Sequence, residues 1–418
     1  MNRPIGIDLF AGAGGMSLGF EQAGFDVACA VEVDPIHCAV HAYNFPLTPV
    51  LNADIERVSG EQIRAAAGIG DREIAVVFGG SPCQGFSLIG KRSLDDPRNA
   101  LVGHFMRIVK ELRPLYFVLE NVKGLTIGKH RMFLKELVDG FENDGYEVAL
   151  PWKVLNAAHF GVPQRRERLF IMGAKRGLPV PAYPAPRTRP ADGRGKGLPE
   201  GLPVGPTVAD AILDLPDADA FPELFDKDWV QTNLGEPSPY AAALRGEAMD
   251  PGDFSHPRSW NHSLLTSSTR SQHTDQTRQR FSEAAPGTVE PVSRFLKLDP
   301  IGICNTLRAG TARDRGAFTA ARPIHPVHPR CITVREMARL HSYPDWFRFH
   351  WTKWHGAREV GNSVPPLLAR AVASAVMEAL GVIPVRPRQA VALGNPSLLT
   401  GTGSADRRED SAILRPAA

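Results

Sequence analysis

Short apolar runs alternate with helical stretches from residue 5 to about residue 175, and this alternation constrains the fold more than any other feature of the chain. The apolar runs lie at residues 5–10, 27–33, 50–53, 74–78, 115–119, 152–156 and 169–173. Helical periodicity lies between them at residues 16–23, 36–43, 99–112 and 132–144. Strand–helix alternation at this spacing predicts βαβ units, and therefore an α/β fold with a doubly wound, mostly parallel sheet.

The remainder of the chain differs in composition. Residues 177–206 are rich in Pro, Gly and Arg, as in a linker; residues 208–253 are acidic, and residues 256–315 are basic. We predict a first domain over 1–178 and a smaller, irregular domain over 179–328 whose basic half faces a polyanion. A solvated charged face is the alternative. A return segment over 329–385 would complete the first domain, and 386–418 would be a disordered tail.

The composition of the chain indicates the cellular compartment in which it works. The 418 residues carry a net charge of +3, which permits a polyanionic partner without requiring one. The five cysteines form no CxxC pair and are odd in number, which favours a reducing cytosol over disulfides or structural zinc. No apolar run reaches membrane-spanning length, and the first residues lack a signal-peptide layout. We therefore expect a soluble, cytoplasmic protein without a metal or a membrane partner.

Cys83 stands out among the cysteines. The run Val76-Val-Phe78 reads as a buried strand that Gly79-Gly-Ser-Pro82 ends, so Cys83 follows a strand's carboxyl end, where open α/β sheets bind ligands. A polar loop with Lys91 and Arg92 comes next and could contact phosphate. The alternative is a buried structural cysteine, the common role of a lone thiol.

Three strand ends predict a site for an adenosine-containing ligand. The Gly-rich loop from Asp8 to Gly15 lets backbone approach a ligand at the start of a helix. Glu32 ends the second strand, where a carboxylate can accept hydrogen bonds from ribose hydroxyls. Asp54 follows the third strand, where Asn52 to Ile55 could hold an adenine amino group. A diphosphate is disfavoured because neither Lys nor Arg accompanies the glycines.

Two further motifs carry ionisable groups. Glu120 ends an apolar run, so partial desolvation should raise the pKa of its carboxyl and let it hold a proton. A helix cap or an ion pair is the alternative role. The cluster Gln164-Arg-Arg-Glu-Arg168 precedes the last strand, and its arginines suit phosphate or a planar carbonyl unless they simply lie on the surface.

Taken together, these motifs resemble the DNA (cytosine-5) methyltransferase family over nearly the whole chain and in the family's order. The matching motifs are Phe10-Ala-Gly-Ala-Gly-Gly15, Glu32, Asp54, Gly79-Gly-Ser-Pro-Cys-Gln84, Glu120-Asn-Val122, Gln164–Arg168, Thr333–Asp345 and Gly361-Asn-Ser-Val-Pro-Pro366. One departure is Ser81, where the family most often has proline. The resemblance implies a Rossmann-like methyltransferase fold, with a catalytic and cofactor-binding domain over 1–178 and a target-recognition domain over 179–328.

The resemblance also implies catalytic roles. Cys83 would add to carbon 6 of cytosine, Glu120 would contact ring nitrogen 3, and Arg168, with Arg166 nearby, would hold the ring carbonyl. Asn121 would support the loop. The base for the final elimination is not identified.

The methyl donor implied is S-adenosyl-L-methionine. Its implied pocket comprises Phe10, Gly12, Gly14, Leu18, Glu32, Val33, Asp54, Ile55, Pro82, Leu101, Asn362, Ser363 and Val364.

The implied partner is double-stranded DNA, bound by a monomeric enzyme, with the target cytosine flipped out of the helix. Gln84 or Ser87 would help to hold the gap. We place the target-reading surface within 256–315 and predict DNA contacts for Arg270, Arg278 and Arg308. The enzyme would be the modification partner in a restriction–modification system.

Three alternatives remain at this point. An RNA cytosine-5 methyltransferase would have the same catalytic motifs, although the large recognition domain favours DNA. A Rossmann-like enzyme acting on a small molecule would not need Cys83 with Glu120 and Arg168. A silent DNA-binding protein would not need the intact motifs.

Overall fold

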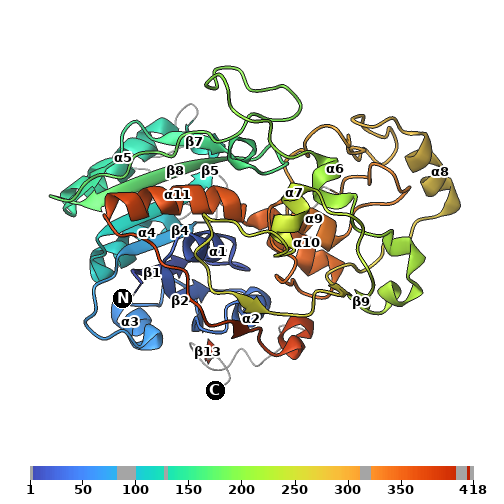
Figure 1. Ribbon diagram of the computed structural model, residues 1–418. Coiled ribbons are helices and arrows are strands. Elements are labelled where there is room, and N and C mark those ends of the chain that lie inside the picture. Colours follow the sequence, from blue (N-terminus) through green and yellow to red (C-terminus); the bar gives the residue numbers. More distant parts are fainter. Residues whose placement is uncertain (1–2, 82–99, 127–129, 311–321, 402–411, 415–418) are drawn as a thin grey trace.

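A nine-stranded sheet organises the protein, which we describe from a computed structural model over residues 3–81, 100–126, 130–310, 322–401 and 412–414 (Figure 1). The strand order is β13-β3-β2-β1-β4-β5-β8-β6, and β7 also pairs with β8. These strands are β1 (Ile5–Leu9), β2 (Asp26–Glu32), β3 (Val50–Asn52), β4 (Val76–Gly80), β5 (Tyr116–Val122), β6 (Tyr146–Val148), β7 (Lys153–Asn156), β8 (Glu167–Lys175) and β13 (Ala412–Leu414). Pairing is parallel from β3 to β5 and antiparallel at β6, β7, β8 and β13, which confirms the predicted fold class.

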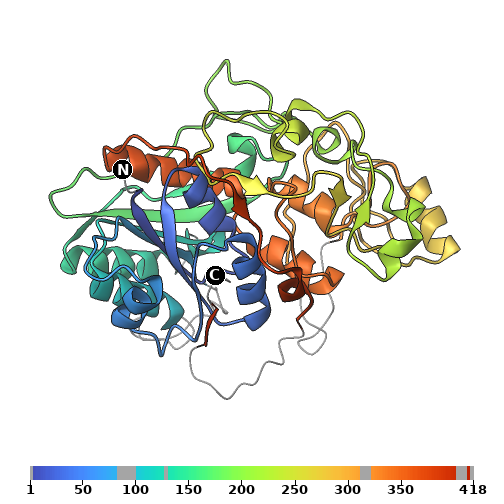
Figure 2. The same cartoon turned by 60° about the horizontal axis from the view of Figure 1, so that its bottom comes forward.

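Helices cover both faces of this sheet because its central strands are apolar on both sides. In β4, Val76 and Phe78 pack on one face and Val77 on the other. The first face is covered by α1 (Gly15–Gln22) and α11 (Pro366–Ala379), and the second by α3 (Gly60–Ala67), α4 (Ala100–Leu112) and α5 (His130–Asn143), as Figure 2 shows. The helix α2 (Pro35–Asn44) lies beside β3 and β13.

The return of α11 to the first domain depends on close helix packing. A Cβ atom on Gly19 of α1 would lie 2.4 Å from Ala369 Cβ of α11, so only glycine permits this approach. Pro366 occupies the first turn of α11, where a missing N–H costs no hydrogen bond. The motif before α11 is thereby carried to the carboxyl ends of β1 and β4.

The irregular part of the chain packs around a second apolar core. It contains α6 (Val208–Ile212), α7 (Pro239–Leu244) and α8 (Asp275–Glu283) with the short strands β9 (Val230–Gln231), β10 (Arg258–Ser259) and β11 (Leu264–Leu265). The helices α9 (Val334–Leu340) and α10 (Lys353–Asn362) join this core rather than the sheet, as Figure 1 shows at the right. The return segment therefore serves both parts of the molecule.

Buried ion pairs explain the acidic composition of residues 208–253. Arg339 of α9 contacts Asp214 at 3.3 Å, and Arg348 contacts Asp228 at 3.0 Å. The carboxylates predicted to form an acidic stretch are thus partly neutralised by arginines from distant segments, and buried charges need such partners.

The predicted disordered tail is wrong for its described residues. The strand β12 (Val391–Ala392) pairs with β10, and β13 extends the sheet beside β3. Leu399, in the 3₁₀ helix η8 (Pro396–Thr400), is 1% exposed in the second core. A few apolar residues spaced among Pro, Gly and Ser are enough to anchor the segment, and the overall composition conceals them. Within the described part of the chain, no helix is long and apolar enough to cross a membrane.

Candidate active site

A cavity of about 380 Å³ opens at the topological switch point of the sheet. The chain runs from β1 to β3 on one side and resumes with β4 on the other side of β1, so loops diverge between β1 and β4. Ten predicted cofactor residues line the cavity: Phe10, Gly12, Glu32, Val33, Asp54, Ile55, Leu101, Asn362, Ser363 and Val364. Pro82 lies outside the described residues.

Two predicted cofactor residues, Gly14 and Leu18, do not line this cavity. Gly14 caps α1 with φ 102°, and a Cβ there would lie 2.4 Å from the Phe45 ring, so this glycine serves the turn. Leu18 is fully buried, and its side chain packs in the second core. Sequence proximity to the glycines does not determine which way a helical side chain faces.

The Gly-rich loop and the end of β2 are joined through Glu32. One carboxylate oxygen of Glu32 accepts a hydrogen bond from Gly12 N at 2.8 Å. The other oxygen accepts from Val33 N at 3.0 Å and Asp34 N at 2.9 Å. Phe10 adopts φ 61° at the sharp exit from β1. Backbone donors therefore hold the Glu32 carboxylate at the cavity wall.

Glu120 and Arg168 form an ion pair on the cavity wall. Arg168 Nε lies 2.8 Å from Glu120 Oε1. The two residues meet because β5 and β8 are antiparallel, with Glu120 opposite Phe170 and Val122 opposite Arg168. Burial raises the pKa of the Glu120 carboxyl, and the positive charges of Arg168 and Arg166 oppose this rise. A Cβ on Gly80 would lie 2.5 Å from Glu120 Oε2, so the glycine leaves room for the carboxylate.

Asn121 holds the chain as it leaves β4. Its Nδ2 donates to Ser81 Oγ at 3.1 Å, and its Oδ1 accepts from Val122 N at 2.8 Å. The hydroxyl of Ser81 is therefore an anchor at the position where the family most often has proline. Cys83 follows two residues later and lies outside the described residues, as do the predicted DNA contacts Gln84 and Ser87.

Arg166 has a different environment from Arg168. It is 1% exposed, and its guanidinium donates to the backbone carbonyls of Leu307, Gly361 and Ser363 at 2.7–2.9 Å. It does not line the cavity. Arg166 thus joins the second core to the motif before α11, and its predicted catalytic role stays a prediction.

A second connection reinforces that junction. Gln164 Oε1 accepts a hydrogen bond from Leu307 N at 3.0 Å, and its Nε2 lies 2.9 Å from His341 Nδ1. His341 Nε2 lies 3.1 Å from Ser363 O. Burial keeps the pKa of His341 well below its usual range, so a neutral ring that accepts from Gln164 and donates to Ser363 satisfies all of these contacts.

The lining residues outside the predicted site include Asp8, Gly15, His37 and Glu359. Asp8 and Gly15 belong to the predicted loop, whereas His37 and Glu359 have no local signal beyond lying close to Glu32 and Asn362. Burial raises the pKa of Asp8 to about 8, opposed by a hydrogen bond of 2.6 Å from Ser17 Oγ.

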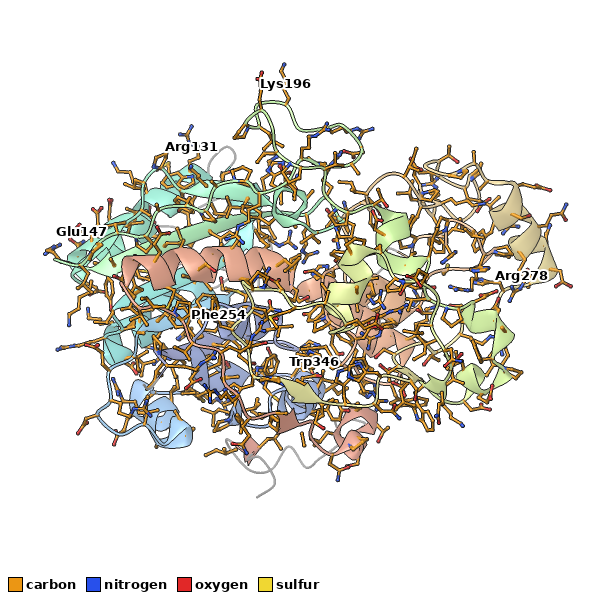
Figure 3. All side chains as sticks on the ribbon, in the orientation of Figure 1. Arg131, Glu147, Lys196, Phe254, Arg278 and Trp346 are labelled. Carbon is orange, nitrogen blue, oxygen red and sulfur yellow. The ribbon has the colours of Figure 1, made fainter. Side chains whose placement is uncertain are left out.

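The predicted DNA-contacting arginines are in different settings. Arg270 and Arg278 both pair with Asp219, at 3.0 and 2.6 Å, and Figure 3 shows Arg278 at the outer edge of the molecule on α8. Arg308 is exposed and lines a hollow of about 850 Å³ beside Arg165. Among the residues that the structure describes, no group of three His, Cys, Asp or Glu side chains could hold a metal ion.

Comparisons with known proteins agree on one family. Residues 5–378 match the family described as C-5 cytosine-specific DNA methylase. The Type II methyltransferase M.XorII of Xanthomonas oryzae pv. oryzae is 60% identical over 399 residues, which cover 96% of this chain and 90% of that protein. The Type II methyltransferase M1.HphI of Haemophilus parahaemolyticus is 36% identical, covering 89% and 86%.

Solved structures extend the similarity to the fold. A DNA modification methyltransferase encoded within an E. coli prophage is 32% identical with a TM-score of 0.72, over 91% of this chain and 100% of that one. The S. pombe Dnmt2 methyltransferase, at 16% identity and a TM-score of 0.54 over 91% and 100% of the two chains, shows the fold alone.

Proposed function

Since the chain belongs to the C-5 cytosine-specific DNA methylases and is a DNA (cytosine-5-)-methyltransferase, we propose how it works: it flips a cytosine out of a specific duplex site and methylates it through a covalent Cys83 adduct. The observation that carries this mechanism is the Glu120–Arg168 pair on the cavity wall next to Ser81, two residues before Cys83. The Type II relatives further support a role in a restriction–modification system.

The pair suits cytosine. Carbon 5 becomes nucleophilic only after the Cys83 thiolate adds at carbon 6 and breaks the ring conjugation. A carboxyl with a raised pKa can donate a proton or a strong hydrogen bond to ring nitrogen 3, as we propose for Glu120. Arg168 would donate to the ring carbonyl while keeping Glu120 in place. After methyl transfer the carbon 5 proton leaves and the Cys83–carbon 6 bond breaks, which restores the thiolate and the aromatic ring.

We propose S-adenosylmethionine as the methyl donor, and the cavity residues fit it. When bound, it supplies the methyl group as a sulfonium. Glu32 would accept from the ribose hydroxyls and Asp54 from the adenine amino group. Asn362 and Ser363 reach the same wall because Arg166 holds the backbone around them. The carboxylates of this wall suit a cationic ligand.

The exposed hollow beside Arg165 is our candidate DNA surface. Five of its lining residues are arginines, three of them exposed (Arg194, Arg294 and Arg308). The other two are Arg322 and Arg165, and Arg165 is paired with Asp192. It lies close to the active site along the chain: Thr306 Oγ1 donates to Arg165 O at 2.6 Å, and Arg165 comes three residues before Arg168. Basic side chains in such a hollow would contact DNA phosphates. The DNA contacts predicted for Arg270 and Arg278 stay predictions.

Salt dependence distinguishes these arginines. Arg308→Ala should weaken duplex binding and lower the slope of log affinity against log salt by about 1. Arg278→Ala is the matched control, because its charge is already balanced by Asp219. A reduced slope for Arg278→Ala alone would move the DNA surface to α8.

The reaction is tested by expressing the protein in a host that lacks cytosine methylation and mapping 5-methylcytosine at single-base resolution, beside Cys83→Ala. Methylation at one short motif, absent in the variant, supports the proposal. The covalent step is tested with duplexes containing 5-fluorocytosine, which cannot lose a carbon 5 proton and should trap the wild type but not Cys83→Ala. Methylated tRNA with unmethylated DNA would favour the RNA enzyme.

A further inference from the structure

One carboxylate oxygen in the cofactor cavity has no hydrogen-bond partner among the residues that the structure describes. Glu359 of α10 is 2% exposed and lines the cavity. Its Oε2 accepts from His350 N at 3.0 Å, whereas Oε1 has no partner in the described part of the chain. Among the described residues that line this cavity, it is the only buried side-chain oxygen or nitrogen left in that condition. Such an atom is costly to bury, so it indicates a donor on the ligand.

The position of Glu359 in the chain places it near the start of α1, and His37 at the start of α2 is a charged neighbour. Glu359 lies one helical turn before Asn362 and Ser363. A Cβ on Gly15, the first residue of α1, would lie 2.9 Å from Ser363 Cβ, so α10 ends against this helix start. Gly14 provides no side-chain cap for α1, which leaves N–H groups suited to a carboxylate. An amino-acid group of a ligand would thus have its carboxylate at α1 and its ammonium close to Glu359.

Charge favours a cation at Oε1. Of the other carboxylates on the wall, Glu120 is paired with Arg168, and Glu32 accepts backbone hydrogen bonds at both oxygens. Asp8 accepts from Ser17 Oγ, and Asp54 accepts from Glu56 N. Burial raises the pKa of Glu359 to about 7, opposed chiefly by the neighbouring His37 and by the bond from His350 N. A cationic donor would offset this desolvation of the carboxylate.

We propose that Glu359 binds the α-ammonium group of the methionyl portion of S-adenosylmethionine. This inference rests on the proposed function and deepens it. Glu359 selects ligands that carry the ammonium group, while Glu32 serves the ribose that all adenosyl ligands share.

Calorimetric binding of S-adenosylhomocysteine to the full-length protein tests the assignment. Glu359→Gln keeps an acceptor for His350 N and removes the negative charge. The variant should bind S-adenosylhomocysteine about 10- to 100-fold more weakly, as expected for a charged hydrogen bond. It should bind the analogue that lacks only the amino group, S-adenosyl-4-thiobutyrate, as the wild type does. Glu32→Gln, the matched control, should weaken both ligands alike.

Unchanged S-adenosylhomocysteine affinity in a folded Glu359→Gln would overturn the inference and leave the proposed function standing. Failure of the wild type to bind S-adenosylhomocysteine at all would instead count against the proposed cofactor. If Glu359→Gln does not fold, the wild type alone decides: at least about tenfold preference for S-adenosylhomocysteine over its deaminated analogue supports the inference, and equal affinity refutes it.

Discussion

Arg166 and Arg168 are two residues apart and of the same type, yet their substitution should have opposite consequences. Arg166→Ala removes the donor of three buried backbone carbonyls. A buried acceptor left unpaired costs about 1–3 kcal/mol, so three give about 3–9 kcal/mol. Part of this cost is offset, because water can enter the vacated space and bind the carbonyls. The variant also no longer has to bury a charged guanidinium group. We expect a loss of about 3–5 kcal/mol in the free energy of unfolding.

Arg168→Ala removes a largely buried ion pair with Glu120, whose two side chains are 15% and 11% exposed, and a bond to its neighbour's carbonyl. The Glu120 carboxyl, whose pKa burial already raises, can take up a proton once Arg168 is gone, so no unpaired charge stays buried. We therefore expect a loss of about 1–2 kcal/mol in the free energy of unfolding, less than for Arg166→Ala. Turnover, however, should fall by about 10²-fold or more, since the proposed contact to the cytosine carbonyl is lost.

Urea unfolding, calorimetric binding of S-adenosylhomocysteine and single-turnover methylation separate the two arginines. Arg166→Ala should lose stability and cofactor affinity together, because Gly361 and Ser363 lose their anchor. Arg166→Lys should lose an intermediate amount of stability and cofactor affinity. The planar guanidinium contacts three carbonyls at once, whereas a single ammonium group cannot reach all three. An Arg166→Ala protein of near wild-type stability and cofactor affinity, but without turnover, would refute the positioning role and restore direct catalysis.

Two further predictions follow from the packing. Gly80→Ala should lower turnover by about tenfold or more with cofactor affinity unchanged, because the added Cβ would displace the Glu120 carboxylate. Gly103→Ala in α4 is the control, since a Cβ there meets no described atom within 4 Å. This variant should leave both turnover and cofactor affinity unaltered. The second prediction concerns the buried Glu336–Arg330 pair. Burial alone would raise the pKa of the Glu336 carboxyl, but the positive charge of Arg330 outweighs this effect and lowers the pKa to about 2. The pair therefore stabilises the protein above the unfolded pKa near 4.5, and its contribution of about 3 kcal/mol is lost as pH falls towards 2. Urea unfolding of wild type and Glu336→Gln should show their difference shrinking below about pH 4.5; a constant difference would contradict this assignment.

Much of the site could be predicted from the sequence because its residues lie at the ends of apolar runs. An apolar run followed by glycines or polar residues identifies where a parallel strand ends, and parallel strands end at one edge of the sheet. Glu32, Asp54 and Glu120 were predicted on that basis, and all three line one cavity. The return of α11 was likewise predictable from its apolar spacing.

Other features depend on contacts between residues far apart in the chain, which no local pattern encodes. Arg339 meets Asp214 across 125 positions, and Arg270 and Arg278 meet Asp219 in the same way, so charge runs overstate the free charge of the surface. The tail is ordered by partners in β10 and β3.

By itself, the sequence determined the family, the α/β fold and the carboxylates at the strand ends, because strand periodicity and short motifs are local properties. Only the tertiary structure decided that Arg168 pairs with Glu120 and lines the cavity while Arg166 holds three backbone segments together. It also decided that Glu359 reaches the same cavity with one oxygen that has no partner among the described residues. The physical reason is that burial and partner choice are set by packing between distant segments, which side-chain identity and spacing alone do not specify.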